Sequence, residues 1–320
     1  MARNSVGRVG TYHNRKETIM HKFICYTPFT GLGLYNGARG NRWLRNRIKI
    51  FKQFVIPSLL NQSDREFIHW ISWRPEERNN KYVRELGGYL SSIPNYKFVF
   101  TFHGIAFWDD KYKDDEAHER LFNSLFKSLP QLMDIIGECS DVRMLLVPSD
   151  DLYSKHTISD INMLFEGSKD IQVVTYTKGY ICNYNTLEVH DYNPTTNPPF
   201  FCIRFPRATF FDPGKHMVYT GPYKSHEYVG DKLKPAYLIN RGFLVGTHGE
   251  NISTHFNHPF RGDVAGGVLE TFGIGEVEPL ELPKSFRKWL IRRLPYKWQK
   301  KFRYWWGERL YKWFYEWIRN

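Results

Sequence analysis

The chain has 320 residues and a mass of 38.1 kDa, and 42% of its residues are hydrophobic and 24% charged. This composition excludes a disordered chain and is typical of a protein with one sizeable hydrophobic core or two small ones. The formal net charge is +12, but residues 284–320 alone hold 12 Lys and Arg against two acids, which leaves residues 21–283 close to neutral. Because the charge is confined to the ends, we do not expect nucleic acid as a partner.

The start of the chain does not have the pattern of a secretory signal. Residues 1–20 are charged and lack an apolar core, and no run of 18 apolar residues follows, so we expect neither a signal peptide nor a membrane-spanning helix. The four cysteines are scattered singly, which favours reduced thiols over a disulfide framework or a zinc site. These observations predict a cytoplasmic protein with a loose N-terminal arm at 1–20.

Hydrophobic periodicity predicts strands and helices that alternate over roughly the first 165 residues. Strands are expected at 22–26, 67–73, 97–102 and 142–147, and helices at 43–56, 75–90, 114–128 and 158–165. Pro57 is expected to end the first of these helices. Strands separated by helices require right-handed crossovers, so this order predicts an α/β domain with an open, mostly parallel sheet flanked by helices.

The second half of the chain has a different pattern. Its short aromatic segments, separated by Pro, Gly and Asn, predict antiparallel additions to the sheet at 171–177, 179–189, 200–205 and 216–219. The expected organisation is an arm at 1–20, an α/β domain at 21–283, and C-terminal amphipathic helices at 284–320.

Polar residues follow the predicted strands at the positions where an open α/β sheet binds its ligands. Thr27 and Pro28 follow the first strand, Arg74 the second, and the pair Asp150 and Asp151 the fourth. Two adjacent carboxylates at a strand end must be solvated, bound to a cation such as Mg²⁺ or Mn²⁺, or used to cap the next helix. The spacing alone leaves both the cation and the cap open.

Three segments together resemble a known family. Residues 145–151 (LLVPSDD) are similar to the strand and D-x-D motif of nucleotide-sugar glycosyltransferases with the GT-A fold. Residues 47–62 with 67–70 resemble the opening of a rhamnosyltransferase-like family, and 235–238 with 247–253 resemble its closing H-G-x-N segment. The resemblance covers about residues 21–260, with one departure: Pro148 stands where some of these motifs have a first aspartate.

The resemblance implies a metal-dependent glycosyltransferase that moves a sugar from a nucleotide-sugar donor to a hydroxyl of a glycan or lipid-linked acceptor, in surface polysaccharide synthesis. It implies Mn²⁺ or Mg²⁺ as cofactor, with a hexose such as rhamnose as the sugar. The implied metal ligands are Asp150, Asp151 and His248, and the implied donor-binding residues are Thr27, Pro28, Arg47, Arg74, Asp150 and Asn251. Arg47 suits a diphosphate because a guanidinium pairs with two phosphate oxygens, although a solvated face is the alternative.

An inverting reaction of this kind needs a general base for the acceptor hydroxyl. We expect Glu227 in that role, with His226 beside it in the segment that precedes the closing motif. His226 and His248 could instead complete the metal site or hold a phosphate oxygen, since imidazole suits both tasks. For each histidine, an ordinary surface or core position is the alternative.

The C-terminal segment has an aromatic stripe among cations. Trp298, Phe302, Trp305, Leu310, Trp313 and Trp317 recur at helical spacing, and six of the ten tryptophans of the chain follow residue 283. Such helices lie in the headgroup plane of anionic membranes, so we expect peripheral attachment to the inner face of a membrane through 284–320. Packing of these helices onto the body is the alternative. The rival function is a non-catalytic membrane- or nucleic-acid-binding protein on a degenerate body of this type.

Overall fold

The computed structural model describes residues 21–30, 40–105, 114–194, 198–220, 229–248 and 267–282, together with Asn251 and Phe256. The chain divides into two compact units, Met1–Pro279 and Leu280–Asn320. The first unit contains every helix and strand named below. The expected arm at 1–20 and the expected helices at 284–320 lie outside the described residues.

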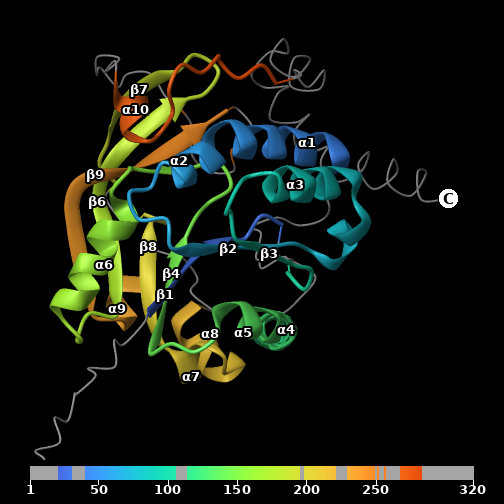
Figure 1. Ribbon diagram of the computed structural model, residues 1–320, viewed down its shortest axis with the longest axis vertical. Coiled ribbons are helices and arrows are strands. Elements are labelled where there is room, and N and C mark those ends of the chain that lie inside the picture. Colours follow the sequence, from blue (N-terminus) through green and yellow to red (C-terminus); the bar gives the residue numbers. More distant parts are fainter. Residues whose placement is uncertain are drawn as a thin grey trace, which may run out of the picture. The chain divides into compact units, whose positions relative to one another are not determined.

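A single sheet forms the centre of the first unit (Figure 1). Within the described residues it has nine strands in the order β3-β2-β1-β4-β8-β6-β9-β5, and β7 pairs with β6. The strands are β1 (His21–Thr27), β2 (Phe67–Ser72), β3 (Phe98–Thr101), β4 (Asp141–Leu146), β5 (Leu152–Tyr153), β6 (Val173–Asn183), β7 (Glu188–Tyr192), β8 (Phe201–Pro206) and β9 (Pro235–Thr247). The four strands predicted in the first half are therefore confirmed.

The sheet has a parallel part and a mixed part. Strands β3, β2, β1 and β4 are all parallel, with Ile24 opposite Ile68 on one side and Met144 on the other. Strand β8 is antiparallel to β4 and to β6, whereas β9 runs parallel to β6. The α/β class, with a mostly parallel first half and antiparallel additions, is confirmed.

Helices cover both faces of the parallel strands. Figure 1 shows α1, α2 and α3 over one face and α4, α5, α7 and α8 over the other. The helical elements are α1 (Gly40–Ile50), α2 (Ile56–Leu60), α3 (Lys81–Ser91), α4 (Asp114–Ser128), α5 (Pro130–Ile136), α6 (Thr157–Gly167), α7 (Arg207–Phe210), α8 (Pro213–Thr220), α9 (Val229–Lys232) and α10 (Val268–Thr271). In the described part of the chain, no helix is long and apolar enough to cross a membrane.

The expectation that Pro57 ends the first helix is wrong. A π-helical turn at Phe51–Val55 links α1 to α2, and the helical path continues to Leu60. Pro57 lies in the first turn of α2, directly after the π-helical turn, so its missing N–H and its ring fall at the irregular step of this helical path.

Two other local expectations need correction. Residues 75–91 form a 3₁₀ turn at Pro75–Asn79 and then α3, because the Asn80 side chain accepts from the Tyr82 amide and caps a new helix. Residues 216–219 belong to the helix α8 and not to a strand. The Asp212 carboxylate accepts from the amides of Gly214 and Lys215 at 3.0 and 3.2 Å and so starts that helix.

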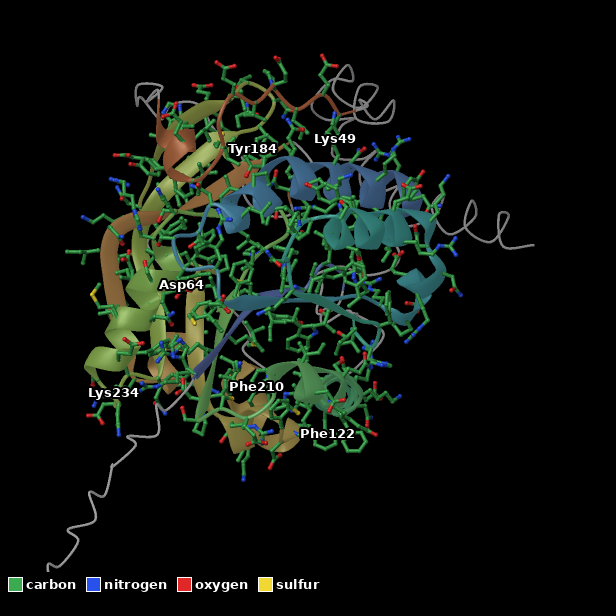
Figure 2. All side chains as sticks on the ribbon, viewed as in Figure 1. Lys49, Asp64, Phe122, Tyr184, Phe210 and Lys234 are labelled. Carbon is green, nitrogen blue, oxygen red and sulfur yellow. The ribbon has the colours of Figure 1, made fainter. Side chains whose placement is uncertain are left out.

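The hydrophobic core lies between the sheet and the helices. On one face, Ile24, Met144 and Phe205 of the strands pack with Leu125 of α4 and Phe210 of α7. Figure 2 labels Phe210 within this layer and Phe122 at its outer edge, where Phe122 is 39% exposed. Burying one such side chain contributes about 1.5–3 kcal/mol, so this layer holds the strand ends in fixed positions.

Candidate functional site

The pair Asp150 and Asp151 lies in the turn that follows the carboxyl end of β4. The ladder with β1 continues for one residue after the strand, since the Val147 amide donates to the Tyr26 carbonyl at 2.8 Å. Pro148 has no amide hydrogen, so it cannot extend the ladder and the chain turns there. The pair therefore follows the end of a parallel strand, as the sequence predicts; a role in ligand binding at that edge stays a prediction.

Asp150 is bound by three side chains from two distant segments, α1 and the turn after β9. Its Oδ2 forms an ion pair with Nη1 of Arg47 on α1 and lies 3.1 Å from Nε2 of His248, which directly follows β9. The Nδ2 atom of Asn251 donates to the same oxygen at 3.3 Å. The side chains of Arg47, Asp150 and His248 are only 4%, 15% and 1% exposed, so these charges interact in a poorly solvated place.

Asp151 is turned toward β9 and not toward this cluster. Its Oδ1 accepts from the backbone amide of Gly246 at 2.9 Å, and the residue is buried. Neither aspartate caps the following helix, because α6 begins six residues later, after His156. The cap alternative does not apply.

The pKa values of the two carboxyl groups are shifted in opposite directions. Burial alone would raise the pKa of Asp150, but the charge of Arg47 and the hydrogen bond and charge of His248 outweigh it and lower that pKa. Burial, followed by the charge of Asp150, raises the pKa of Asp151 well above its ordinary value. The site therefore has one firmly ionised carboxylate, Asp150, in contact with a buried cation.

Asn251 closes the turn that follows β9. Its Oδ1 accepts from the His248 amide at 2.8 Å, and its Nδ2 donates to the Gly246 carbonyl at 2.6 Å as well as to Asp150. Both hydrogen-bonding ends of this amide are thus used to place His248 beside Asp150. In this structure, the closing motif of the sequence resemblance fixes the position of His248 relative to Asp150.

Residues of the opening motif also position the aspartates. Ser58 Oγ donates to the Tyr153 carbonyl, and Gln62 Nε2 donates to the Ser154 carbonyl, each at 2.8 Å. The Ile158 amide donates to Gln62 Oε1 at 3.2 Å. α2 and the residues that directly follow it therefore hold the segment after the aspartate pair, and the sequence pattern alone predicts no role for these two side chains.

Two further residues were missed by sequence reasoning. The Tyr184 hydroxyl donates to the Asp150 carbonyl at 2.9 Å, and its ring stacks on Phe54 at a centroid distance of 3.9 Å. Figure 2 labels Tyr184 on the side of the sheet that α1 and α2 cover. A Cβ atom at Gly246 would collide with the Asp150 carbonyl and the Tyr184 ring, so only glycine fits at this close approach.

The Asp150 and His248 side chains fit a divalent cation as a pair. Their Oδ2 and Nε2 atoms are 3.1 Å apart. Two neighbouring ligands of an octahedral ion, each about 2.1 Å from the metal, would lie about 3 Å apart. Among the described residues no group of three or more His, Cys, Asp or Glu side chains is placed to hold a metal. Of the three expected ligands, the fold brings Asp150 and His248 together and directs Asp151 to Gly246.

The other expected donor-binding residues lie at the ends of β1 and β2. Thr27 is fully buried, with Oγ1 2.8 Å from Nε2 of His69, so in this structure it presents no surface to a ligand. Pro28 is partly exposed directly after it. Arg74 donates from Nε to the Thr30 carbonyl at 3.2 Å, which ties the end of β2 to that of β1.

The expected catalytic residues Glu227 and His226 lie outside the described residues. Their roles stay predictions from the sequence. The described site therefore comprises Arg47, Asp150, Asp151, His248 and Asn251, with Gly246, Tyr184, Ser58 and Gln62 supporting it.

Comparisons with known proteins found similarity at the level of structure only. No protein-family model and no curated protein sequence matches the chain. Two solved structures of S. aureus TarS cover 71% of this chain, with 13% identity and a TM-score of 0.37 for TarS 1–349, and 14% and 0.39 for TarS. The chain covers 60% and 37% of those two structures. The apo structure of mouse xyloside xylosyltransferase 1 matches 50% of this chain, and the match spans 53% of the mouse protein's chain. The identity is 12% and the TM-score 0.29.

Proposed function

We propose that the protein is a glycosyltransferase that takes a sugar from a nucleotide-sugar donor and transfers it to a hydroxyl group of a glycan or lipid-linked acceptor. The observation that supports this function most is the meeting of Arg47, Asp150, His248 and Asn251 beyond the end of β4. These are four of the residues that the family resemblance implies for donor and metal binding.

The charges of the site suit the departure of a nucleoside diphosphate. As the sugar leaves, negative charge develops on the diphosphate and must be neutralised. A bound Mn²⁺ or Mg²⁺ would supply Lewis-acid neutralisation of that charge, and Asp150 and His248 are the residues that would hold the ion. Arg47 adds a second positive charge at the same place, and a guanidinium pairs well with phosphate oxygens.

The acceptor side of the reaction rests on the sequence. We propose Glu227 as the base that removes the acceptor proton, with His226 in a supporting role. Three further proposals also rest on the sequence alone. They are rhamnose as the transferred sugar, a role in surface polysaccharide synthesis, and attachment to an anionic membrane through 284–320.

A screen of nucleotide sugars by thermal shift, with and without Mn²⁺, tests the proposal. A ligand that binds only the folded state stabilises it and so raises the melting temperature. When the free ligand is at a hundred times its dissociation constant, the added free energy of unfolding is about 2.7 kcal/mol. We expect one nucleotide sugar to stabilise the chain, and to do so more with Mn²⁺. If no donor does so, while anionic vesicles or oligonucleotides bind, the non-catalytic alternative replaces the enzyme.

A further inference from the structure

The ion pair between Arg47 and Asp150 gives the site a cation of its own. Arg47 is buried, and its guanidinium carbon lies 5.3 Å from the centroid of the Trp43 ring on the same helix. A buried carboxylate without a counter-ion is costly, and removing one partner of such a pair strongly destabilises a protein. Arg47 therefore stabilises the ionised Asp150 in the ligand-free protein.

The same pair also obstructs the site. Arg47 contacts Oδ2 of Asp150, which is also the oxygen that lies 3.1 Å from His248 Nε2. A divalent cation held by Asp150 and His248 would use this oxygen, and its charge would repel a guanidinium bound to the same atom. The guanidinium and the ion therefore compete for one carboxylate oxygen.

A diphosphate offers the guanidinium another partner. Phosphate oxygens accept the paired N–H groups of Arg in the same bidentate way as a carboxylate does. We propose that Arg47 is an exchangeable counter-ion: it pairs with Asp150 when the site is empty, and it transfers to the diphosphate of the donor when the divalent cation takes its place on Asp150. This inference rests on the proposed function. It makes cation and donor binding mutually dependent, because either one alone leaves a charge unpaired.

The first experiment measures Mn²⁺ binding without nucleotide, by the loss of the free Mn²⁺ signal in electron paramagnetic resonance. We expect Arg47→Gln to bind Mn²⁺ at least about tenfold more tightly than the parent, because the competing cation is gone. Arg45→Gln is the matched control, since Arg45 is exposed on the same helix, and its Mn²⁺ affinity should equal that of the parent. A purely structural role of Arg47 would lower or leave unchanged the Mn²⁺ affinity of Arg47→Gln, and that result would overturn the proposal.

The second experiment measures binding of UDP, GDP, dTDP and CDP in EDTA by calorimetry. Asp150→Asn releases the guanidinium, so we expect the preferred diphosphate to bind more tightly to this variant than to the parent. The double variant Arg47→Gln/Asp150→Asn leaves no unpaired charge and so avoids the folding problem of the single Arg47 change. The gain should vanish in the double variant. An equal gain in diphosphate affinity in both variants would show that loss of the carboxylate charge alone causes the gain. The proposed transfer of Arg47 to the diphosphate would then be wrong.

The two experiments separate this inference from the proposed function. If no nucleoside diphosphate binds the parent chain with or without Mn²⁺, the glycosyltransferase proposal fails, and the exchange onto a diphosphate fails with it. If a diphosphate binds with Mn²⁺ but Arg47→Gln leaves the Mn²⁺ affinity unchanged, the function stands and only the exchange is overturned.

Discussion

The Ser58 hydroxyl and the Tyr153 backbone form two hydrogen bonds: Ser58 Oγ donates to the Tyr153 carbonyl at 2.8 Å and accepts from the Tyr153 amide at 3.0 Å. This contact joins α2 to the short strand β5, two residues after the aspartate pair. Both residues are buried, so water cannot replace a lost partner. The position of Asp151 therefore depends on a buried serine of α2.

Ser58→Ala should destabilise the protein, because it leaves the buried amide and carbonyl of Tyr153 without this partner. The expected loss is about 1–3 kcal/mol in the free energy of unfolding, measured by urea denaturation. Ser92→Ala is the control, since Ser92 Oγ donates only to the exposed Tyr89 carbonyl at the end of α3 and should change little. Equal effects of the two substitutions would contradict the account of the Ser58 contact.

Gly246→Ala should disturb the site directly. The added methyl group would collide with the Asp150 carbonyl and the Tyr184 ring, and overpacking of this kind costs about 1–3 kcal/mol. Gly88→Ala in α3 is a matched control, because a Cβ there meets no atom within 4 Å and alanine favours a helix. Thermal unfolding should show a lower melting temperature for the first variant and an equal or higher one for the second. A tolerated Gly246→Ala would mean that β9 and Asp150 are not this close.

Acid should destabilise the fold through His69. Its ring lies between Thr27 Oγ1 at 2.8 Å and the Tyr96 hydroxyl at 2.6 Å, and burial lowers its pKa from 6.5 to about 3. The unfolded chain thus binds a proton below pH 6.5 that the folded chain excludes, so stability is complete above that pH and falls as the pH drops toward 3. At pH 5 the loss from this residue is about 2 kcal/mol.

The check is urea unfolding at pH 7 and pH 5 for the parent and for His69→Gln. The variant should lose less stability between the two pH values than the parent does. His216 has its pKa lowered to about 3 by burial as well, so part of the acid effect should remain in the variant. An unchanged pH dependence in His69→Gln would show that His69 is not the group that titrates.

A chain that ends at Leu282 should lose its attachment to membranes. Each Lys or Arg near an anionic surface contributes about 1 kcal/mol, and truncation removes 12 of them together with six tryptophans. The full chain should sediment with anionic vesicles at low salt but not at high salt, whereas the truncated chain should stay in solution and still bind donor. Unfolding on truncation, with no vesicle binding by the intact chain, would favour the packed-helix alternative.

The sequence is sufficient to predict which residues approach the ligand-binding edge but not what they do there. The position of Asp150 is predictable because the residues that follow parallel strands lie at one edge of the sheet. The positions of His248 and Asn251 are predictable because both belong to the closing segment at 247–253. Burial of Arg47 against Asp150 could not be foreseen, since helical periodicity treats a charged residue as solvated. Whether an arginine faces solvent or a buried carboxylate depends on the tertiary packing of α1.

The missed supporting residues share a physical reason. Gly246 and Tyr184 matter because β9 and the turn after β6 approach Asp150 from segments more than 30 residues away in sequence, and no local pattern encodes that approach. The wrong strand at 216–219 had a local signal, since Asp212 and Pro213 are typical of a helix start. There, the aromatic and β-branched residues favour a strand, but the capping of α8 by Asp212 outweighs that local preference.

In the proposed reaction, Asp150 holds the cation that neutralises the departing diphosphate. The most direct test uses the nucleotide sugar that raises the melting temperature of the chain, and measures how fast nucleoside diphosphate is released from it. With Mn²⁺ present, the parent and the control Asp134→Asn, which changes an exposed aspartate on α5, should release the diphosphate at equal rates. Asp150→Asn should slow the release by about 10²–10³-fold, as expected for loss of charge stabilisation in the transition state. Equal rates in all three proteins would contradict the assignment of this site.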